Sequence, residues 1–234
     1  MNVASQPYSF PVEGRFEPQQ AALLIIDMQR DFCDPRGYMG SRGDDVLAAQ
    51  ALVPRILAVR EAARAAGMKV MYTREGHRPD LGDLPSCKRA KTRHGGAEIG
   101  TRGPLGRLLV RGEPGWEIIS QLRPGRNEAV IDKPGTGAFY ATDLQHMLVT
   151  QGIAHLVLVG VTTAVCVSST AREAADRGFN VLVLSDCCAE PNPHTHAIAL
   201  ALLTVEDGYI AAVSESDALL QVLRRQLPPM GATT

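Results

Sequence analysis

The sequence predicts an α/β protein, a three-layer α/β/α sandwich built around a mainly parallel sheet. Three observations support this fold class. Runs of branched apolar residues, such as AALLII at 21–26 and LVLV at 156–159, are typical of strands buried on both faces. Segments with helical spacing lie between these runs. Strands that alternate with helices favour a parallel sheet whose two faces are both covered.

Length and composition fit one domain with a sizeable core. The chain has 234 residues, of which 45% are hydrophobic. The formal net charge is -1 and the basic residues form no stripe, so the sequence does not favour a nucleic-acid partner. No apolar run approaches the roughly 18 residues of a membrane-spanning helix, and we expect no signal peptide and no membrane partner.

The cysteines indicate a reducing compartment. They are odd in number, scattered and without CxxC spacing, so they favour neither a disulfide framework nor a zinc site. Free thiols are typical of intracellular proteins, and we therefore expect a cytoplasmic protein. The five are Cys33, Cys87, Cys166, Cys187 and Cys188.

We expect an N-terminal arm at 1–20 and a single domain at 21–234. The arm holds three prolines and little periodicity, which favours a segment lying over the surface or over a neighbouring subunit. A long polar segment at 74–107 is expected as a loop, and a loop of that length is usually functional. The expected strands are 21–26, 69–73, 129–132, 156–159, 181–184 and 209–213. The main expected helices are 45–66, with a break or a new start near Pro54, and 116–122, 143–151, 164–177, 196–205 and 215–226.

Three reactive residues, Asp27, Lys133 and Cys166, each follow an expected strand. Because the carboxyl ends of parallel strands share one edge of a sheet, we expect these side chains to lie together. A thiol, a carboxylate and an ammonium at one place suit nucleophilic catalysis. The alternatives are structural: an aspartate that caps a loop, a lysine in a solvated turn and a cysteine buried in the core.

Cys166 falls in the first turn of the helix expected at 164–177. Free N–H groups and the positive end of the helix dipole favour a thiolate there. This position predicts a thiol pKa below the usual value of about 8.5. The same N–H groups are suited to hold an oxyanion.

Three separated motifs, ALLIIDMQRDF, DKPGTGAFYATDL and VGVTTAVCVSSTAREAADRGF, resemble those of the isochorismatase-like cysteine hydrolases. The resemblance covers roughly residues 20–215. It implies that Asp27 is the general base, that Lys133 supports it and that Cys166 is the nucleophile. It also implies a cis peptide bond between Val161 and Thr162, with the N–H groups of Thr162 and Cys166 directed at the oxyanion.

Within that family, YTREGHRPDLGDLP, RGPLGRLLVRGEPGW and IDKPGTGAFYATDL most resemble biuret hydrolases and their triuret-cleaving relatives. The metal motif of the nicotinamidases, an Asp-x-His with a further His, is absent from the sequence. His77 stands alone in that region, and a single histidine makes no metal site. We therefore expect no metal and no other cofactor, and a hydrogen-bonding role for His77.

Four further residues are candidates for substrate contacts: Glu206, Phe139, Phe32 and Arg74. By the resemblance, Glu206 lies near the glutamine with which biuret hydrolases read the ureido group, and a carboxylate accepts the N–H donors of biuret or triuret. Phe139 would form a wall of the pocket, and Arg74 would meet a substrate carboxylate or carbonyl. The alternatives are a solvated charge for Glu206 or Arg74 and a core aromatic for Phe139.

The residues and the resemblance together predict an amidohydrolase that releases ammonia from biuret or triuret through a Cys166 thioester. The nearest alternative is a ureidoacrylate or other N-carbamoyl amidohydrolase of the same family. An alternative of another class is a binding protein that kept the fold and lost catalysis. The resemblance also implies that the protein is a homo-oligomer, a tetramer. It implies that the molecule it binds is a small ureido substrate.

Overall fold

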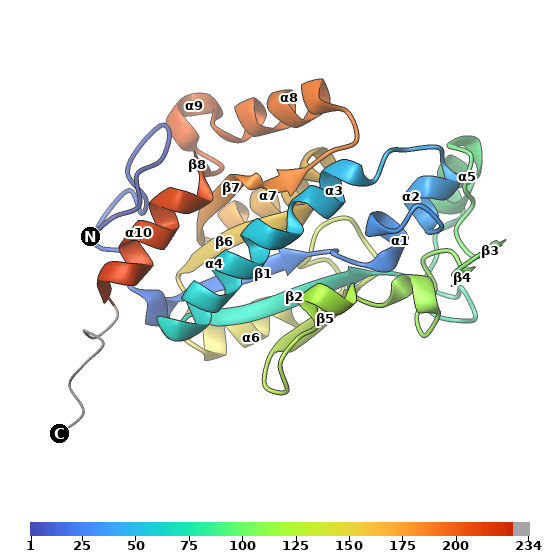
Figure 1. Ribbon diagram of the computed structural model, residues 1–234, viewed down its shortest axis with the longest axis horizontal. Helices are drawn as coiled ribbons and strands as arrows, with labels where there is room; N and C mark the ends of the chain where they lie inside the picture. Colours follow the sequence, from blue (N-terminus) through green and yellow to red (C-terminus); the bar gives the residue numbers. More distant parts are fainter. Residues whose placement is uncertain (227–234) are drawn as a thin grey trace.

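The computed structural model describes residues 1–226 and shows one sheet between two layers of helices (Figure 1). Helices α4 (Val53–Ala65) and α10 (Ser216–Gln226) cover one face of the sheet. Helices α6 (Leu144–Thr150) and α7 (Ser168–Asp176) cover the other face. The predicted three-layer α/β/α sandwich is confirmed.

The main sheet has six parallel strands in the order β5-β2-β1-β6-β7-β8. Counted along the chain, this order is third, second, first, fourth, fifth, sixth, which is the doubly wound arrangement. The direction of winding reverses between β1 and β6, and sheets of this kind bind ligands at the carboxyl ends of the strands beside that reversal. The strands are β1 (Ala21–Ile26), β2 (Lys69–Glu75), β5 (Ala129–Lys133), β6 (His155–Val161), β7 (Asn180–Ala189) and β8 (Ala212–Ser214).

Strand β1 lies in the centre of the sheet and is buried on both faces. Its alternate side chains enter two separate clusters: Leu23 and Ile25 pack on the side of α4 and α10, and Leu24 packs on the side of α6 and α7. Gly160 of β6 lies so close to β1 that a Cβ at this position would stand 2.1 Å from the carbonyl oxygen of Ile26. The two strands therefore approach closely at the end where β1 stops.

The segment 74–107 differs from the expected loop. It contains helix α5 (Ser86–His94) and a small hairpin of β3 (Arg102–Gly103) and β4 (Gly106–Arg107). No residue of α5 is buried, so the helix has no apolar face that periodicity in the sequence could reveal. The helix expected at 45–66 is divided at Leu52, close to the break expected near Pro54: α3 (Leu47–Ala51) ends there, and α4 begins with Pro54 in its first turn.

The remaining helices connect these parts, and residues 1–20 pack against the domain of the same chain. Gln6 pairs with Val213 of β8 in an antiparallel bridge, and Phe10 and Phe16 are buried beside His155. Across residues 1–226, no helix combines the length and apolar character needed to span a membrane. The other helices are α1 (Arg30–Cys33), α2 (Tyr38–Ser41), α8 (Pro193–Leu203) and α9 (Val205–Gly208).

Candidate active site

Asp27, Lys133 and Cys166 meet at the carboxyl edge of the sheet. The Lys133 Nζ lies 2.8 Å from Asp27 Oδ2 and donates to the Cys166 Sγ at 3.5 Å. All three side chains are buried. The strand-end reasoning therefore placed these residues correctly relative to one another, at the reversal between β1 and β6.

Local hydrogen bonds fix the two charged members of this group. The backbone N–H of Asp27 donates to the Thr73 hydroxyl at 3.2 Å, and that hydroxyl donates to Asp27 Oδ1. Lys133 is the last residue of β5, and its ammonium also donates to the carbonyls of Gly135 and Thr136, at 3.0 Å each. A strand end and a following turn thus hold each charge in place.

Cys166 lies in a single π-helical turn, Thr163–Val167, between β6 and α7. The Val161–Thr162 peptide bond is cis, as the resemblance implies. Within residues 1–226, the N–H of Thr162 has no hydrogen-bond partner. The resemblance pairs it with the N–H of Cys166, which belongs to the π-helical turn. Two donors beside a nucleophile are the arrangement that an oxyanion requires.

A fourth residue, Glu75, belongs to this group, and the prediction from the sequence did not include it. The Cys166 thiol donates to Glu75 Oε2 at 3.3 Å, and Lys133 Nζ lies 3.5 Å from the same oxygen. Lys88 of α5 donates to Glu75 Oε1 at 2.6 Å and to the Pro134 carbonyl at 2.7 Å. The expected strand ended at Thr73, whereas β2 continues to Glu75, so the strand-end rule was applied two residues too early.

Burial dominates the electrostatics of the site. Burial raises the pKa of the Cys166 thiol; Lys133 opposes this, but Asp27 and Glu75 add to it. The pKa lowering predicted from the helix N-terminus is therefore wrong for this arrangement, because desolvation outweighs the backbone dipole. Burial therefore favours the neutral form of the Cys166 thiol.

The pKa values of the two carboxyl groups, those of Asp27 and Glu75, are shifted in opposite directions. Burial raises the pKa of Asp27, although Lys133 works against it. Burial acts in the same sense on Glu75, but Lys133 and Lys88 together hold its pKa below the usual value. For Lys133, burial favours the neutral amine, yet Asp27, Cys166 and Glu75 raise its pKa and keep it charged.

Comparison with known proteins decides the family. A sequence model of the isochorismatase domain matches residues 21–217. The chain belongs to the isochorismatase family. It is an amidohydrolase of that family, a hydrolase of C–N bonds other than peptide bonds, so the alternative of a non-catalytic binding protein is set aside.

Individual members of the isochorismatase family resemble the chain over most of its length. The ureidoacrylate amidohydrolase RutB of Serratia proteamaculans is 30% identical over 220 residues, which cover 91% of this chain and 86% of the relative. An isochorismatase family protein from Desulfovibrio vulgaris aligns with a TM-score of 0.72 at 29% identity, covering 88% and 99% of the two chains. The N-carbamoylsarcosine amidase of Thermoplasma acidophilum aligns with a TM-score of 0.64 at 26% identity, covering 85% and 97%.

The donor atoms of this isochorismatase-family site are arranged around an ammonium. Ligand atoms of Asp27, Glu75 and Cys166 all lie within 4.8 Å of one another, a spacing that a metal ion can bridge. The charged Lys133 contacts all three, so a cation already balances these donors. His77 Nδ1 lies 3.3 Å from Asp83 Oδ1, which agrees with a hydrogen-bonding role.

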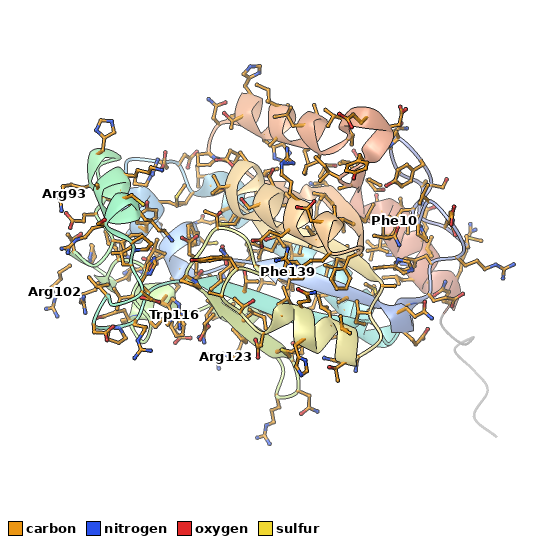
Figure 2. All side chains as sticks on the ribbon, turned by 180° about the vertical axis from the view of Figure 1, so that it is seen from behind. Phe10, Arg93, Arg102, Trp116, Arg123 and Phe139 are labelled. Atoms are coloured by element: carbon orange, nitrogen blue, oxygen red, sulfur yellow. The ribbon has the colours of Figure 1, made fainter. Side chains whose placement is uncertain are left out.

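Two of the four predicted substrate contacts have side chains that are engaged with other parts of the protein. Arg74 points away from Thr73 and Glu75, since neighbours on a strand face opposite sides; it binds Asp132 at 2.8 Å and stacks 3.5 Å above the Trp116 ring. Phe139 lies in the core, where its ring stacks on Phe179 at 5.8 Å between centroids (Figure 2 labels Phe139 and Trp116).

The third, Glu206, lies at the wrong end of the sheet. It lines a surface hollow together with Tyr8 and with Asn180, the first residue of β7. Cys166 lies in the turn after the carboxyl end of β6, and β6 runs parallel to β7. The length of the sheet therefore separates Cys166 from Glu206. The Glu206 prediction is therefore wrong for a site within one chain. Phe32 remains a candidate, because it lines a narrow cleft together with Thr162.

Asp31 ties the loop after β1 to the segment that follows the β3–β4 hairpin. Its carboxylate accepts from the Leu109 N–H at 2.9 Å and from the Tyr38 N–H at 3.1 Å. Burial raises the pKa of Asp31 to about 6, even though both backbone hydrogen bonds lower it. The folded protein thus holds a proton on Asp31 at pH values where the unfolded chain has lost it.

This difference predicts that stability falls as pH rises from about 4 through 6. In that range the unfolded state binds fewer protons than the folded state, so the free energy of unfolding decreases with pH. Asp31→Asn is neutral in both states and should flatten this part of the profile. Urea unfolding between pH 4 and 7 measures the effect, and equal slopes for wild type and variant would contradict it.

Proposed function

We propose that this protein hydrolyses the carbamoyl C–N bond of a small linear ureido substrate through a thioester on Cys166. The observation that carries the proposal is the position of the Cys166 thiol. It stands at the winding reversal of the sheet, in contact with the Lys133 ammonium and four residues after Thr162, whose N–H has no partner among residues 1–226. This is a nucleophile, a charge that supports acid–base chemistry and an oxyanion site in one place.

The reaction has two halves. The sulfur of Cys166 attacks the carbamoyl carbon, and the N–H groups of Thr162 and Cys166 hold the resulting oxyanion. A buried carboxylate takes the thiol proton and passes it to the departing nitrogen. The resemblance assigns this role to Asp27. Water, activated by Asp27, then attacks the thioester, and the sulfur leaves as the acid product forms. The proposal needs neither metal nor cofactor.

The distribution of charge favours a substrate that carries a carboxylate. Residues 74–113 contain nine lysines and arginines against five aspartates and glutamates, a net charge of +4 in a chain of net charge -1. Figure 2 shows Arg93 and Arg102 at the end of the molecule away from Phe10. Lys88 of this segment contacts Glu75 in the site, and a basic surface beside a site attracts anions. Because curated relatives carry the name ureidoacrylate amidohydrolase, ureidoacrylate is the first candidate.

Biuret or triuret is the second candidate, and the three subgroup motifs support it. These motifs, YTREGHRPDLGDLP, RGPLGRLLVRGEPGW and IDKPGTGAFYATDL, include Glu75 and Lys133 themselves. Both ureas are uncharged, so the basic segment gives them no electrostatic advantage. The homotetramer and the cytoplasmic location stay predictions.

Ammonia release separates these candidates. We expect the wild type to release ammonia from ureidoacrylate, or from biuret or triuret, in a panel that also holds nicotinamide and N-carbamoylsarcosine. Cys166→Ser should lose at least about 10³-fold in kcat, because it removes the covalent route. Cys87→Ser, at an exposed position, is the matched control and should keep full activity. Full activity of Cys166→Ser would exclude the thioester.

Ionic strength tests the charge argument. If the basic segment draws in an anionic substrate, kcat/KM for ureidoacrylate should fall several-fold between about 0.01 M and 0.5 M salt, because salt shortens the range of the attraction. The kcat/KM for biuret should stay constant over the same range and serves as the control. A salt-independent kcat/KM for ureidoacrylate would remove the electrostatic reason for preferring it.

A further inference from the structure

The pair Glu75–Lys88 has no place in the reaction as described above, yet it contacts the reacting atom. Glu75 Oε2 accepts the hydrogen of the Cys166 thiol at 3.3 Å, and Lys88 binds the other oxygen at 2.6 Å. Both Glu75 and Asp27 are buried, and each is paired with a lysine. The site therefore contains two carboxylate–ammonium pairs where a single general base would need one.

Both carboxylates lie near the sulfur, within 4.8 Å of it, and the thiol donates to Glu75 Oε2 at 3.3 Å. Asp27 has one oxygen bound by the Thr73 hydroxyl and the other paired with Lys133. Glu75 uses Oε1 for Lys88, so Oε2 is directed at the thiol. The hydrogen bond from the thiol thus gives its proton a direct path to Glu75.

We propose that Glu75 is a second catalytic carboxylate, which takes the Cys166 thiol proton during attack and carries it to the departing nitrogen. The proposal rests on the proposed function and divides its acid–base work. Glu75 serves the first half of the reaction, and Asp27 serves the second.

Protons balance in both halves. In the first, the S–C bond forms, the thiol proton moves to Glu75 Oε2, and the C–N bond breaks as Glu75 gives that proton to the leaving nitrogen. In the second, water forms a C–O bond to the thioester carbon and gives a proton to Asp27. The S–C bond then breaks, and Asp27 returns its proton to the sulfur of Cys166. Both carboxylates end ionised, as they began.

The surroundings of Glu75 suit this task. Gln29 holds its backbone from both sides, accepting from the Glu75 N–H at 2.7 Å and donating to its carbonyl at 3.0 Å. Lys133 and Lys88 keep its pKa low despite burial, so the carboxylate is ionised and ready to accept a proton. Glu75 interacts electrostatically with six titratable or charged groups: Lys88, Lys133, Cys166, Asp27, His77 and Tyr38.

The contact itself is tested without any substrate. Alkylation of Cys166 by iodoacetamide is followed by mass spectrometry of its peptide as a function of pH. Glu75→Gln removes the charge and the acceptor that favour the thiol, so the apparent pKa of alkylation should fall by at least about one unit. Glu117→Gln, which removes an exposed carboxylate bound to Arg74, is the matched control and should leave that pKa unchanged. An unchanged pKa in Glu75→Gln would overturn the proposal.

The proton transfer is tested by changing the leaving group. In single turnovers, Glu75→Gln should acylate about 10²–10³-fold more slowly with the ureido substrate, whose nitrogen needs a proton to leave. With 4-nitrophenyl carbamate, whose phenolate leaves without a proton, the same variant loses only the uptake of the thiol proton, so its rate loss should be at least about ten-fold smaller than with the ureido substrate. A purely structural role for Glu75 would slow both reactions equally, and that result would contradict the proposal.

Lys88→Met provides a second variant that keeps Glu75. Because Lys88 lowers the pKa of Glu75, its removal should move the acidic limb of the acylation profile to higher pH, by about one unit. A limb that stays in place while the plateau falls would overturn the proposal. If no ureido substrate is hydrolysed by the wild type, the proposed function fails, and the alkylation experiment still decides whether Glu75 accepts the thiol hydrogen.

Discussion

A buried ammonium, that of Lys133, is the interaction on which the site depends. A charge inside a protein is costly unless opposite charges and hydrogen bonds compensate for it. Here Asp27 lies 2.8 Å away, and Glu75 and the Cys166 sulfur lie 3.5 Å away. These partners come from β1, β2 and the turn after β6, so one cation fixes the relative position of three neighbouring strand ends. Loss of that cation would leave two carboxylates buried beside a thiol.

The same constraint explains why the chemistry lies at this point of the fold. In a doubly wound sheet, β1 and β6 are neighbours whose connections run to opposite faces, which leaves room at their carboxyl ends. The π-helical turn that holds Cys166 lies there, and helix α7 follows it. The close approach at Gly160 brings the ends of β1 and β6 together. Fold and catalytic arrangement therefore depend on the same few residues.

The contact between α5 and the site joins a surface segment to this buried centre. Helix α5 buries none of its own residues, and its Lys88 reaches Glu75 and the Pro134 carbonyl. The basic segment that would attract an anion is thus bonded directly to the carboxylate that faces the thiol. This connection gives substrate binding and the ionisation of the site a shared physical basis.

The sequence was sufficient to predict the site residues whose positions are determined by the ends of strands. Asp27, Lys133 and Cys166 were predicted together because each follows a run of apolar residues, and parallel strands end at one edge. The same rule would have found Glu75 had β2 been continued by two residues. Lys88 had no such signal, because a helix without a buried face shows no apolar periodicity.

The errors also have physical causes. Arg74 neighbours Glu75 in sequence, yet a strand turns adjacent side chains to opposite faces, and this one pairs with Asp132. Glu206 was placed by resemblance alone, whereas its position depends on how α8 and α9 return along the sheet to the amino end of β7. The thiol pKa was judged from the helix N-terminus, and only the structure shows how completely Cys166 is buried.

The most direct test of the account is to look for the covalent intermediate. Wild-type enzyme is quenched with acid during turnover of whichever ureido substrate releases ammonia, and its peptides are examined by mass spectrometry. The account predicts an acyl adduct derived from the substrate on the peptide that carries Cys166, formed and lost at rates that match turnover. Turnover without an adduct on Cys166, or with an adduct on another residue, would contradict it.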